Sequence, residues 1–131
     1  MAAMTYAEAK ERLLGIGAHY TTFVPAADID AADHIGDLVT ITDEGEVGSG
    51  ADAGIPFGVI AGYETDAVSV QDGGYAEITY EHNANAALEV TVGCWVETDG
   101  AGLGALAAAA TGCYAVAVDA TNHKAIVKFG L

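Results

Sequence analysis

Basic residues are scarce in this sequence of 131 residues: Lys and Arg number four, against nineteen Asp and Glu, which gives a formal net charge of −15. Between Leu13 and His123 there is no Lys or Arg, whereas seventeen of the nineteen acids (all except Glu8 and Glu11) lie in that stretch. A surface of this charge repels the phosphate backbone of nucleic acids. The composition therefore argues against DNA or RNA as a partner.

The excess of acid leaves two interpretations open. The carboxylates either form an ordinary solvated surface or adapt the chain to a halophilic host, in which molar salt screens charges that crowd one another. Scarce Lys, plentiful Asp and small apolar residues fit the halophilic interpretation, and they fit an ordinary acidic protein as well.

Long apolar runs are missing too. No stretch approaches the roughly 18 consecutive apolar residues of a transmembrane helix, and the first six residues hold no basic region ahead of an apolar run, as a signal peptide would. We therefore expect no membrane partner and synthesis in a host cytoplasm. Hydrophobic residues make up 52% of the chain, but only three are Phe and one is Trp. Small side chains of this kind suit a single domain with a thin barrel or sandwich.

Cysteine is limited to Cys94 and Cys113, which lie in two expected strands. A disulfide between these strands is geometrically feasible. A cytoplasmic chain more often keeps such cysteines as small buried hydrophobes, so we favour reduced thiols and leave the bridge open.

The signal that is present is that of short β-strands. Three segments of the last forty residues are rich in Val, Ile or aromatic residues and bounded by Gly, Asp or Asn, namely 92–100, 111–119 and 124–129. Earlier strands are expected at about 37–42, 57–62, 66–71, 75–81 and 87–92. The Gly- and acid-rich segments 43–54 and 99–111 are expected to be long loops.

The early strands and the late ones coincide under one constant shift along the chain. Gly36 falls on Gly93 (93 − 36 = 57), and the order of strand, long loop, strand, turn and strand recurs. The same shift sets Leu38 and Val39 on Trp95 and Val96, Phe57-Gly58-Val59 on Tyr114-Ala115-Val116, and Val68 and Val70 on Ala125 and Val127. We predict a duplicated three-stranded unit, with matching backbones in residues 36–72 and 93–129.

The N-terminal segment predicts one short helix. Thr5 and Glu8 have the spacing of a capping box, and apolar residues then recur at helical spacing up to Gly15 and Gly17. A helix of two to three turns is unstable alone, so it either covers an open end of the barrel or forms an arm that grips a neighbouring subunit. An extended run, 19–25, follows. We therefore divide the chain into a helix and arm, 1–25, and a β-barrel domain, 26–131, and expect a chain that starts near Pro25 to fold.

No catalytic or metal-binding pattern emerges. Asp28, Asp30 and Asp33 are spaced like the start of a calcium loop, but the sixth position lacks the required Gly and the twelfth lacks Glu. The Gly-rich segment 48–54 lacks the Lys and the following helix of a phosphate loop. The four histidines are scattered, with no pair at ligand spacing, and neither serine has the sequence context of a catalytic nucleophile. We expect no enzyme, no cofactor and no metal site.

The order of strands resembles a known family. A Gly-x-x-Val strand, a loop, an aromatic-Gly/Ala-Val-Ala strand, a turn with Asp and a closing Val strand are similar to the small capsid cement, or head decoration, proteins of tailed viruses. The resemblance covers about residues 36–131, and the segments 55–61, 66–70 and 74–78 look like the middle of the lambda-type head decoration protein.

That resemblance implies an all-β fold: a small, partly open β-barrel of the β-tulip or SH3-like kind, built from two similar three-stranded units with a short N-terminal helix or arm. It implies a virion protein that sits on the outer surface of the capsid, binds the major capsid protein and stabilises its lattice as a homotrimer. The residues that we expect to attach the chain to its neighbours are those of the N-terminal segment: Tyr6, Lys10, Arg12, Leu13, Leu14, Ile16, Tyr20 and Phe23.

Two other functions stay open. One is a carbohydrate- or cation-binding β-module, for which Tyr63 and Tyr75 are the candidate exposed aromatics beside acids. The other is the base of a capsid surface fibre, which differs by its partner chain rather than by its own sequence.

Overall fold

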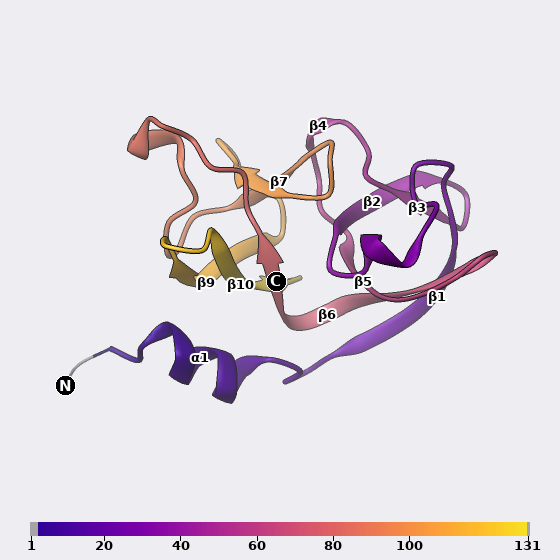
Figure 1. The fold of residues 1–131 in the computed structure, drawn as a ribbon. Coiled ribbons are helices and arrows are strands. Elements are labelled where there is room, and N and C mark those ends of the chain that lie inside the picture. Colours follow the sequence, from indigo (N-terminus) through magenta and orange to yellow (C-terminus); the bar gives the residue numbers. More distant parts are fainter. Residues whose placement is uncertain (1–2, 131) are drawn as a thin grey trace.

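The computed structural model describes residues 3–130, which form one α-helix, two 3₁₀ turns and ten strands (Figure 1). In chain order these are α1 (Tyr6–Leu13), β1 (His19–Pro25), η1 (Ala32–His34), β2 (Leu38–Asp43), β3 (Glu46–Gly48), β4 (Asp52–Gly54), β5 (Gly58–Glu64), β6 (Ala67–Thr79), η2 (Ala86–Leu88), β7 (Val96–Asp99), β8 (Gly104–Leu106), β9 (Cys113–Asp119) and β10 (Lys124–Phe129). The predicted all-β class, a small partly open barrel of two similar units, is confirmed.

The first half of the chain closes into a small barrel. Its strands pair in the order β1-β3-β2-β5-β6, and β6 pairs again with β1, so that the ring has no free edge. β1 and β3 run parallel, whereas the other pairs are antiparallel. The core of this first barrel consists of Ile29, Val39, Val47, Ile60, Val68 and Val70, with Phe23, Phe57 and Tyr63 packed against it.

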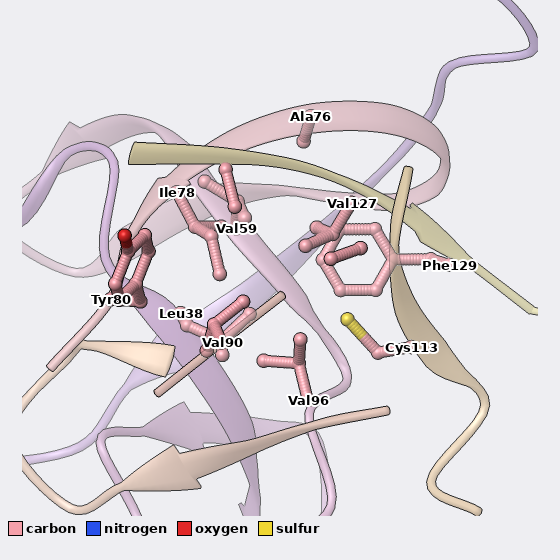
Figure 2. Close-up of a cluster of buried hydrophobic side chains, with 12 residues drawn as sticks. Leu38, Val59, Ala76, Ile78, Tyr80, Val90, Val96, Cys113, Val127 and Phe129 are labelled. Atoms are coloured by element: carbon pink, nitrogen blue, oxygen red, sulfur yellow. The ribbon is translucent and has the colours of Figure 1, made fainter. Parts of the chain in front are cut away.

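The second half forms a more open ring. β10 is fully paired with β6 on one side and with β9 on the other, and β7 is paired with β8. Two single bridges close the rest of the ring. One joins Trp95, just before β7, to Tyr114 of β9, and the other joins Tyr80, just after β6, to Gly104 of β8. β4 pairs with the free edge of β7. The core of this second barrel is shown in Figure 2 and contains Leu38, Val59, Ala76, Ile78, Tyr80, Val90, Val96, Cys113, Ala115, Ala125, Val127 and Phe129.

Strand β6 belongs to both barrels. The sequence predicts two strands, 66–71 and 75–81, but the structure has one strand of 13 residues that crosses from the first barrel to the second (Figure 1). Its first half buries Val68 and Val70 in the first core, and its second half buries Ala76 and Ile78 in the second. Gly73 and Gly74 mark the change of barrel and do not interrupt the strand.

The two barrels repeat one pattern of strand pairing. In the first, Thr40 of β2 pairs with Gly48 of β3; in the second, Glu97 of β7 pairs with Ala105 of β8, at the predicted shift (97 − 40 = 57; 105 − 48 = 57). β2 and β3 therefore correspond to β7 and β8.

A second, slightly smaller shift relates β5 to β9. Leu38 pairs with Val59 in the first barrel, and Trp95 is bridged to Tyr114 in the second (95 − 38 = 57; 114 − 59 = 55). The two strands also share an irregularity of register at the same point. In the pairing of β5 with β6 the register shifts between Ile60 and Gly62, and in the pairing of β9 with β10 it shifts between Ala115 and Ala117 (115 − 60 = 55; 117 − 62 = 55). A shared β-bulge is a feature that independent barrels would have no reason to place at the same point.

The smaller shift also makes the second half of β6 the counterpart of β1. Pro25 pairs with Val47 in parallel, and Tyr80 with Gly104 in parallel (80 − 25 = 55; 104 − 47 = 57). Each unit therefore has five strands, two more than the sequence predicts, and the halves of β6 serve as the last strand of one unit and the first of the next.

Two predictions about individual segments are wrong. Residues 87–92 form no strand but the turn η2 and an irregular segment, because Asn85 caps that turn and Val90 is the one residue of the segment that is buried. The expected loops 43–54 and 99–111 contain the short strands β3, β4 and β8. These strands have three residues each and a high content of Gly, Ala and acid, so they carry no recognisable strand pattern.

The predicted helix and its capping box are confirmed. The Thr5 hydroxyl accepts from the Glu8 amide at 3.2 Å, and the Glu8 carboxylate accepts from the Thr5 amide at 3.2 Å. α1 lies against β9 and buries Ala9. The run 19–25 is not an arm but strand β1, paired with β6 and β3, so it is part of the first barrel.

Within residues 3–130, no helix has the length and the hydrophobicity needed to cross a membrane.

Candidate functional site

Much of the predicted attachment segment is engaged with its own chain. The Tyr6 hydroxyl donates to Glu77 at 2.9 Å, and Lys10 forms an ion pair with the same carboxylate at 3.4 Å. Burial and then the hydrogen bond to Glu77 raise the pKa of Tyr6 above its ordinary value. Phe23 packs edge-on against Phe57, with ring centroids 5.3 Å apart, at the core of the first barrel. Leu13 and Leu14 are partly buried, and the Arg12 side chain is exposed.

Two residues of that segment with large apolar or aromatic side chains face outward. Ile16 is 54% exposed and Tyr20 is 55% exposed. Further along β1, Val24 is 56% exposed and lies on the same strand face as Tyr20, because alternate residues of a strand share a face. We name Ile16, Tyr20 and Val24 the outer strip. Ile16 and Tyr20 belong to the predicted attachment segment, whereas the sequence did not predict Val24.

The contact between the two barrels is made by side chains that point out of the first one. Leu38 and Val59 alternate with Val39 and Ile60, which fill the first core. Leu38 and Val59 therefore project outward, where they are covered by the second barrel and belong to its core (Figure 2). Leu38 is fully buried and Val59 is 6% exposed.

The equivalent positions in the second barrel carry Trp95 and Tyr114. Their neighbours Val96, Cys113 and Ala115 fill the second core, so these two aromatic side chains project outward as Leu38 and Val59 do. The rings are edge-to-face, with centroids 5.7 Å apart and an interplanar angle of 81°. Both residues are only partly buried. The face that one unit uses to bind the next is thus left partly open on the last unit.

Three side chains that the sequence did not predict to meet come together at the end of the second barrel. His82 Nδ1 is 2.6 Å from Glu89 Oε1, and His123 Nε2 is 3.8 Å from the same oxygen. The two imidazole rings are tilted by 33°, with centroids 4.5 Å apart. The fold thus brings together histidines that are scattered along the sequence. Their separations along the chain (89 − 82 = 7; 123 − 89 = 34) carry no sequence signal, and only the fold brings these side chains together.

The environment of Glu89 is that of a carboxylate held in its charged form. The hydrogen bond with His82, the backbone amide of Asn83 and the nearby rings of His82 and His123 hold the pKa of Glu89 below its usual range, against a smaller opposing effect of burial. Glu89 therefore presents a charged carboxylate to the two imidazole rings.

The acidic loop that resembled a calcium loop is occupied by internal hydrogen bonds. Asp28 accepts from the Ser49 amide at 3.1 Å, and His34 lies 3.2 Å from Asp30 and 2.8 Å from Asp37. Both cysteines are free thiols: Cys113 is buried, which raises its pKa to about 12, and Cys94 is half-buried. These residues form no visible site.

The aromatic residues of the carbohydrate alternative are only partly accessible. Tyr63 packs against the first core and also lines an open hollow of about 390 Å³ together with Glu64 and Ser69. Tyr75 is partly buried within β6 and pairs with Lys128.

Among known proteins, no family model matches the chain, and no curated protein does either.

Proposed function

We propose that this chain is a capsid decoration protein, a structural component that binds the outer surface of a viral capsid lattice, contacts other copies of itself and stabilises the shell. The order of strands resembles that family, and the small, partly open barrel of two similar units is the fold that the family implies. The homotrimer and the major capsid protein as a partner rest on the same resemblance.

The observation that carries the proposal is the Trp95–Tyr114 pair. Its equivalents Leu38 and Val59 bury themselves against another barrel of the same kind. We assign the partly open Trp95–Tyr114 face to contact with a second copy, because the equivalent face of the first unit is covered by a barrel. Burial of one large apolar side chain contributes about 1.5–3 kcal/mol, so two aromatic rings are enough to bias how neighbouring copies meet on a lattice.

The outer strip of Ile16, Tyr20 and Val24 is the second surface, and we assign it to the capsid. Tyr20 and Val24 lie on β1 of the first barrel and Ile16 lies just before it, whereas Trp95 directly precedes β7 and Tyr114 lies on β9 of the second. A protein that clamps a lattice needs one surface for the lattice and another for its own copies, and these two surfaces lie on different barrels.

Coating of capsid particles that lack the chain tests the proposal. The wild-type chain is expected to co-sediment with such particles and to saturate them. Trp95→Ala together with Tyr114→Ala is expected to reduce the steepness of the binding curve, because copies no longer support one another. Tyr20→Ala with Val24→Ala is expected to weaken attachment itself.

The matched control is Ile55→Ala, which removes an apolar side chain that is 65% exposed and lies outside both surfaces. It is expected to coat as the wild type does. Failure of the wild-type chain to bind any particle, or equal loss in all three variants, would contradict the proposal.

Salt dependence is a separate prediction from the charge of −15. Raising NaCl from dilute to molar shortens the Debye length from more than about 10 Å to about 3 Å and so relieves repulsion among the carboxylates. We expect the melting temperature and the coating of particles both to rise with NaCl. Calorimetry and co-sedimentation at matched protein concentration measure the two effects.

A variant with less charge provides the control. Glu11→Gln, Glu44→Gln and Glu64→Gln replace three exposed acids and change the net charge to −12 (−15 + 3). Its melting temperature is expected to rise less steeply with salt. A flat or falling response of the wild type would remove the halophilic interpretation.

A further inference from the structure

The cluster of His82, Glu89 and His123 has the composition of a transition-metal site. Each residue offers one ligand atom, and these three atoms lie within 4.8 Å of one another. A single ion between them would therefore be in reach of all three. Two imidazoles and a carboxylate suit zinc and its neighbours in the first transition row, whereas calcium and magnesium prefer sets of oxygen ligands.

The backbone that carries two of these ligands is tied to the core of the second barrel. Glu89 precedes Val90, which is 2% exposed in the core of the second barrel. The His123 carbonyl accepts from the amide of the buried Tyr80 at 2.9 Å, and the ring of Tyr80 lies edge-on to that of His123, with centroids 5.6 Å apart. These contacts hold two of the ligands in place before any ion binds.

His82 is held in the same way through its neighbour. The Glu81 amide donates to the Gly104 carbonyl at 2.7 Å, which ties the start of the segment to β8. The His82 side chain itself is 60% exposed, so an ion has an open path from solvent. Glu89 and His123 are more covered, with side-chain exposures of 19% and 34%.

The cluster occurs only where the second unit departs from the first. The connection from Tyr80 to Trp95 is two residues longer than the equivalent connection from Pro25 to Leu38 (95 − 80 = 15; 38 − 25 = 13). The turn between β5 and β6 has two residues, 65–66, and the turn between β9 and β10 has four, 120–123. His82 and Glu89 lie in the first of these longer segments, and His123 lies in the second.

His123 also adopts an unusual backbone conformation. Its φ of +53° lies in the left-handed region, where His, Asn and Asp are the most frequent residues after Gly. The turn thus accepts this histidine and directs its side chain from a fixed backbone position.

We propose that His82, Glu89 and His123 bind one divalent transition-metal ion of the zinc class, with water in the remaining coordination positions. The ion joins the segment 81–94 to the β9–β10 turn. It thereby fastens the end of the second barrel, the more open of the two rings, where η2 is the only regular element of a long connection. The proposal concerns the isolated chain and does not depend on the proposed capsid function.

Isothermal titration with ZnCl₂ of the full chain, freed of metal by a chelator, tests the site. We expect saturation at one ion per chain, and a melting temperature that rises when zinc is added. Glu89→Gln keeps the shape of the side chain, and His123→Asn keeps a residue that tolerates positive φ. Each is expected to weaken zinc binding at least tenfold. Loss of a residue that only hydrogen-bonds to a metal ligand already weakens metal binding by about tenfold or more, and these substitutions change the ligands themselves.

The control variants remove histidines that have acidic partners but no second imidazole. His19 contacts Asp72, and His34 contacts Asp30 and Asp37. His19→Asn and His34→Asn are expected to bind zinc as the wild type does. Magnesium in tenfold excess over zinc is expected not to displace it.

Three outcomes would overturn the site. One is the absence of saturable zinc binding by the wild-type chain. Another is unchanged binding in Glu89→Gln and His123→Asn. The third is displacement of zinc by magnesium, which would assign the binding to scattered carboxylates. Circular dichroism of each variant without metal shows whether the variant is folded. If Glu89→Gln or His123→Asn does not fold, His82→Ala replaces it, because His82 lies at an exposed position.

Discussion

A chain that begins at Pro25 is expected to lose the first barrel. Every residue of β1 except Pro25 would be missing, and with them the five pairs that join β1 to β6, the pair of Val24 with Glu46 of β3 and the Phe23 ring that packs on Phe57. Phe23 is partly buried, so the loss of its ring alone costs up to about 3–5 kcal/mol, the range for a fully buried aromatic side chain. Domains of this size are stable by about 5–15 kcal/mol in all, so the remaining strands cannot keep the ring closed.

The matched control is a chain that begins at Gly15. It lacks α1 but keeps β1 and the backbone bonds of Gly15 and Ile16 with Tyr75. We expect it to unfold cooperatively at a lower temperature than the full chain, because the packing of α1 on β9 and the contacts of Tyr6 and Lys10 with Glu77 are lost while both barrels keep their strands. Far-ultraviolet circular dichroism and thermal melting compare the two. Cooperative folding of the chain that begins at Pro25 would show that β1 is a dispensable arm, as the sequence pattern predicts.

Gly74→Ala is expected to be the most destabilising of the conservative substitutions. Gly74 has a φ of +76°, and a Cβ there would lie 2.4 Å from the Ile16 carbonyl oxygen and 2.6 Å from the Gly17 carbonyl carbon. These are backbone atoms that cannot rotate away, at the point where the chain before β1 crosses β6. We expect a loss of more than about 3 kcal/mol in the free energy of unfolding, measured by denaturant titration and close to the exceptional range for a point mutation.

Two other glycines separate the causes of that loss. Gly112 has a φ of +81°, but a Cβ there would meet no atom within 4 Å, so Gly112→Ala is expected to cost only the conformational strain, about 1–2 kcal/mol. Gly62 has ordinary φ and a Cβ there would lie 3.7 Å from Ser69, so Gly62→Ala is expected to change stability by about 0.5 kcal/mol or less. Equal effects at all three positions would show that the crossing at Gly74 is not tightly packed.

The strands with several Val, Ile or aromatic residues could be predicted from the sequence, as could the capping box of α1. Leu38 and Val39, or Val68 and Val70, mark their strands by side-chain type alone. β3, β4 and β8 could not be predicted, because they have three residues each and are held by neighbouring strands rather than by their own preferences.

The duplication was visible in the sequence only in part. A single shift aligns β2 with β7 and the first half of β6 with β10 (95 − 38 = 57; 127 − 70 = 57), but β5 and β9 need a smaller one (114 − 59 = 55). The two-residue differences lie in turns, where length changes cost little. They conceal the match of β1 with the second half of β6, which becomes apparent from the pairing of Pro25 with Val47 and of Tyr80 with Gly104.

The candidate sites are harder to predict from the sequence than the strands, because they exist only once the chain has folded. Trp95 and Tyr114 are well separated in the chain (114 − 95 = 19), and nothing in their sequence context shows that they occupy the positions of a buried contact in the other unit. His82 and His123 are further apart still (123 − 82 = 41) and meet because their loops close the same end of one barrel. Sequence spacing predicts sites that lie on one element, and each of these sites is built from two.

Imaging of particles coated with the wild-type chain tests the central claim most directly. Cryo-electron microscopy at a resolution that separates the strands would show where the chain sits and which faces meet. The account predicts density on the outer surface of the lattice, with Tyr20 and Val24 toward the capsid and Trp95 and Tyr114 against a neighbouring copy. Particles without such density, or copies whose Trp95 and Tyr114 face solvent, would contradict it.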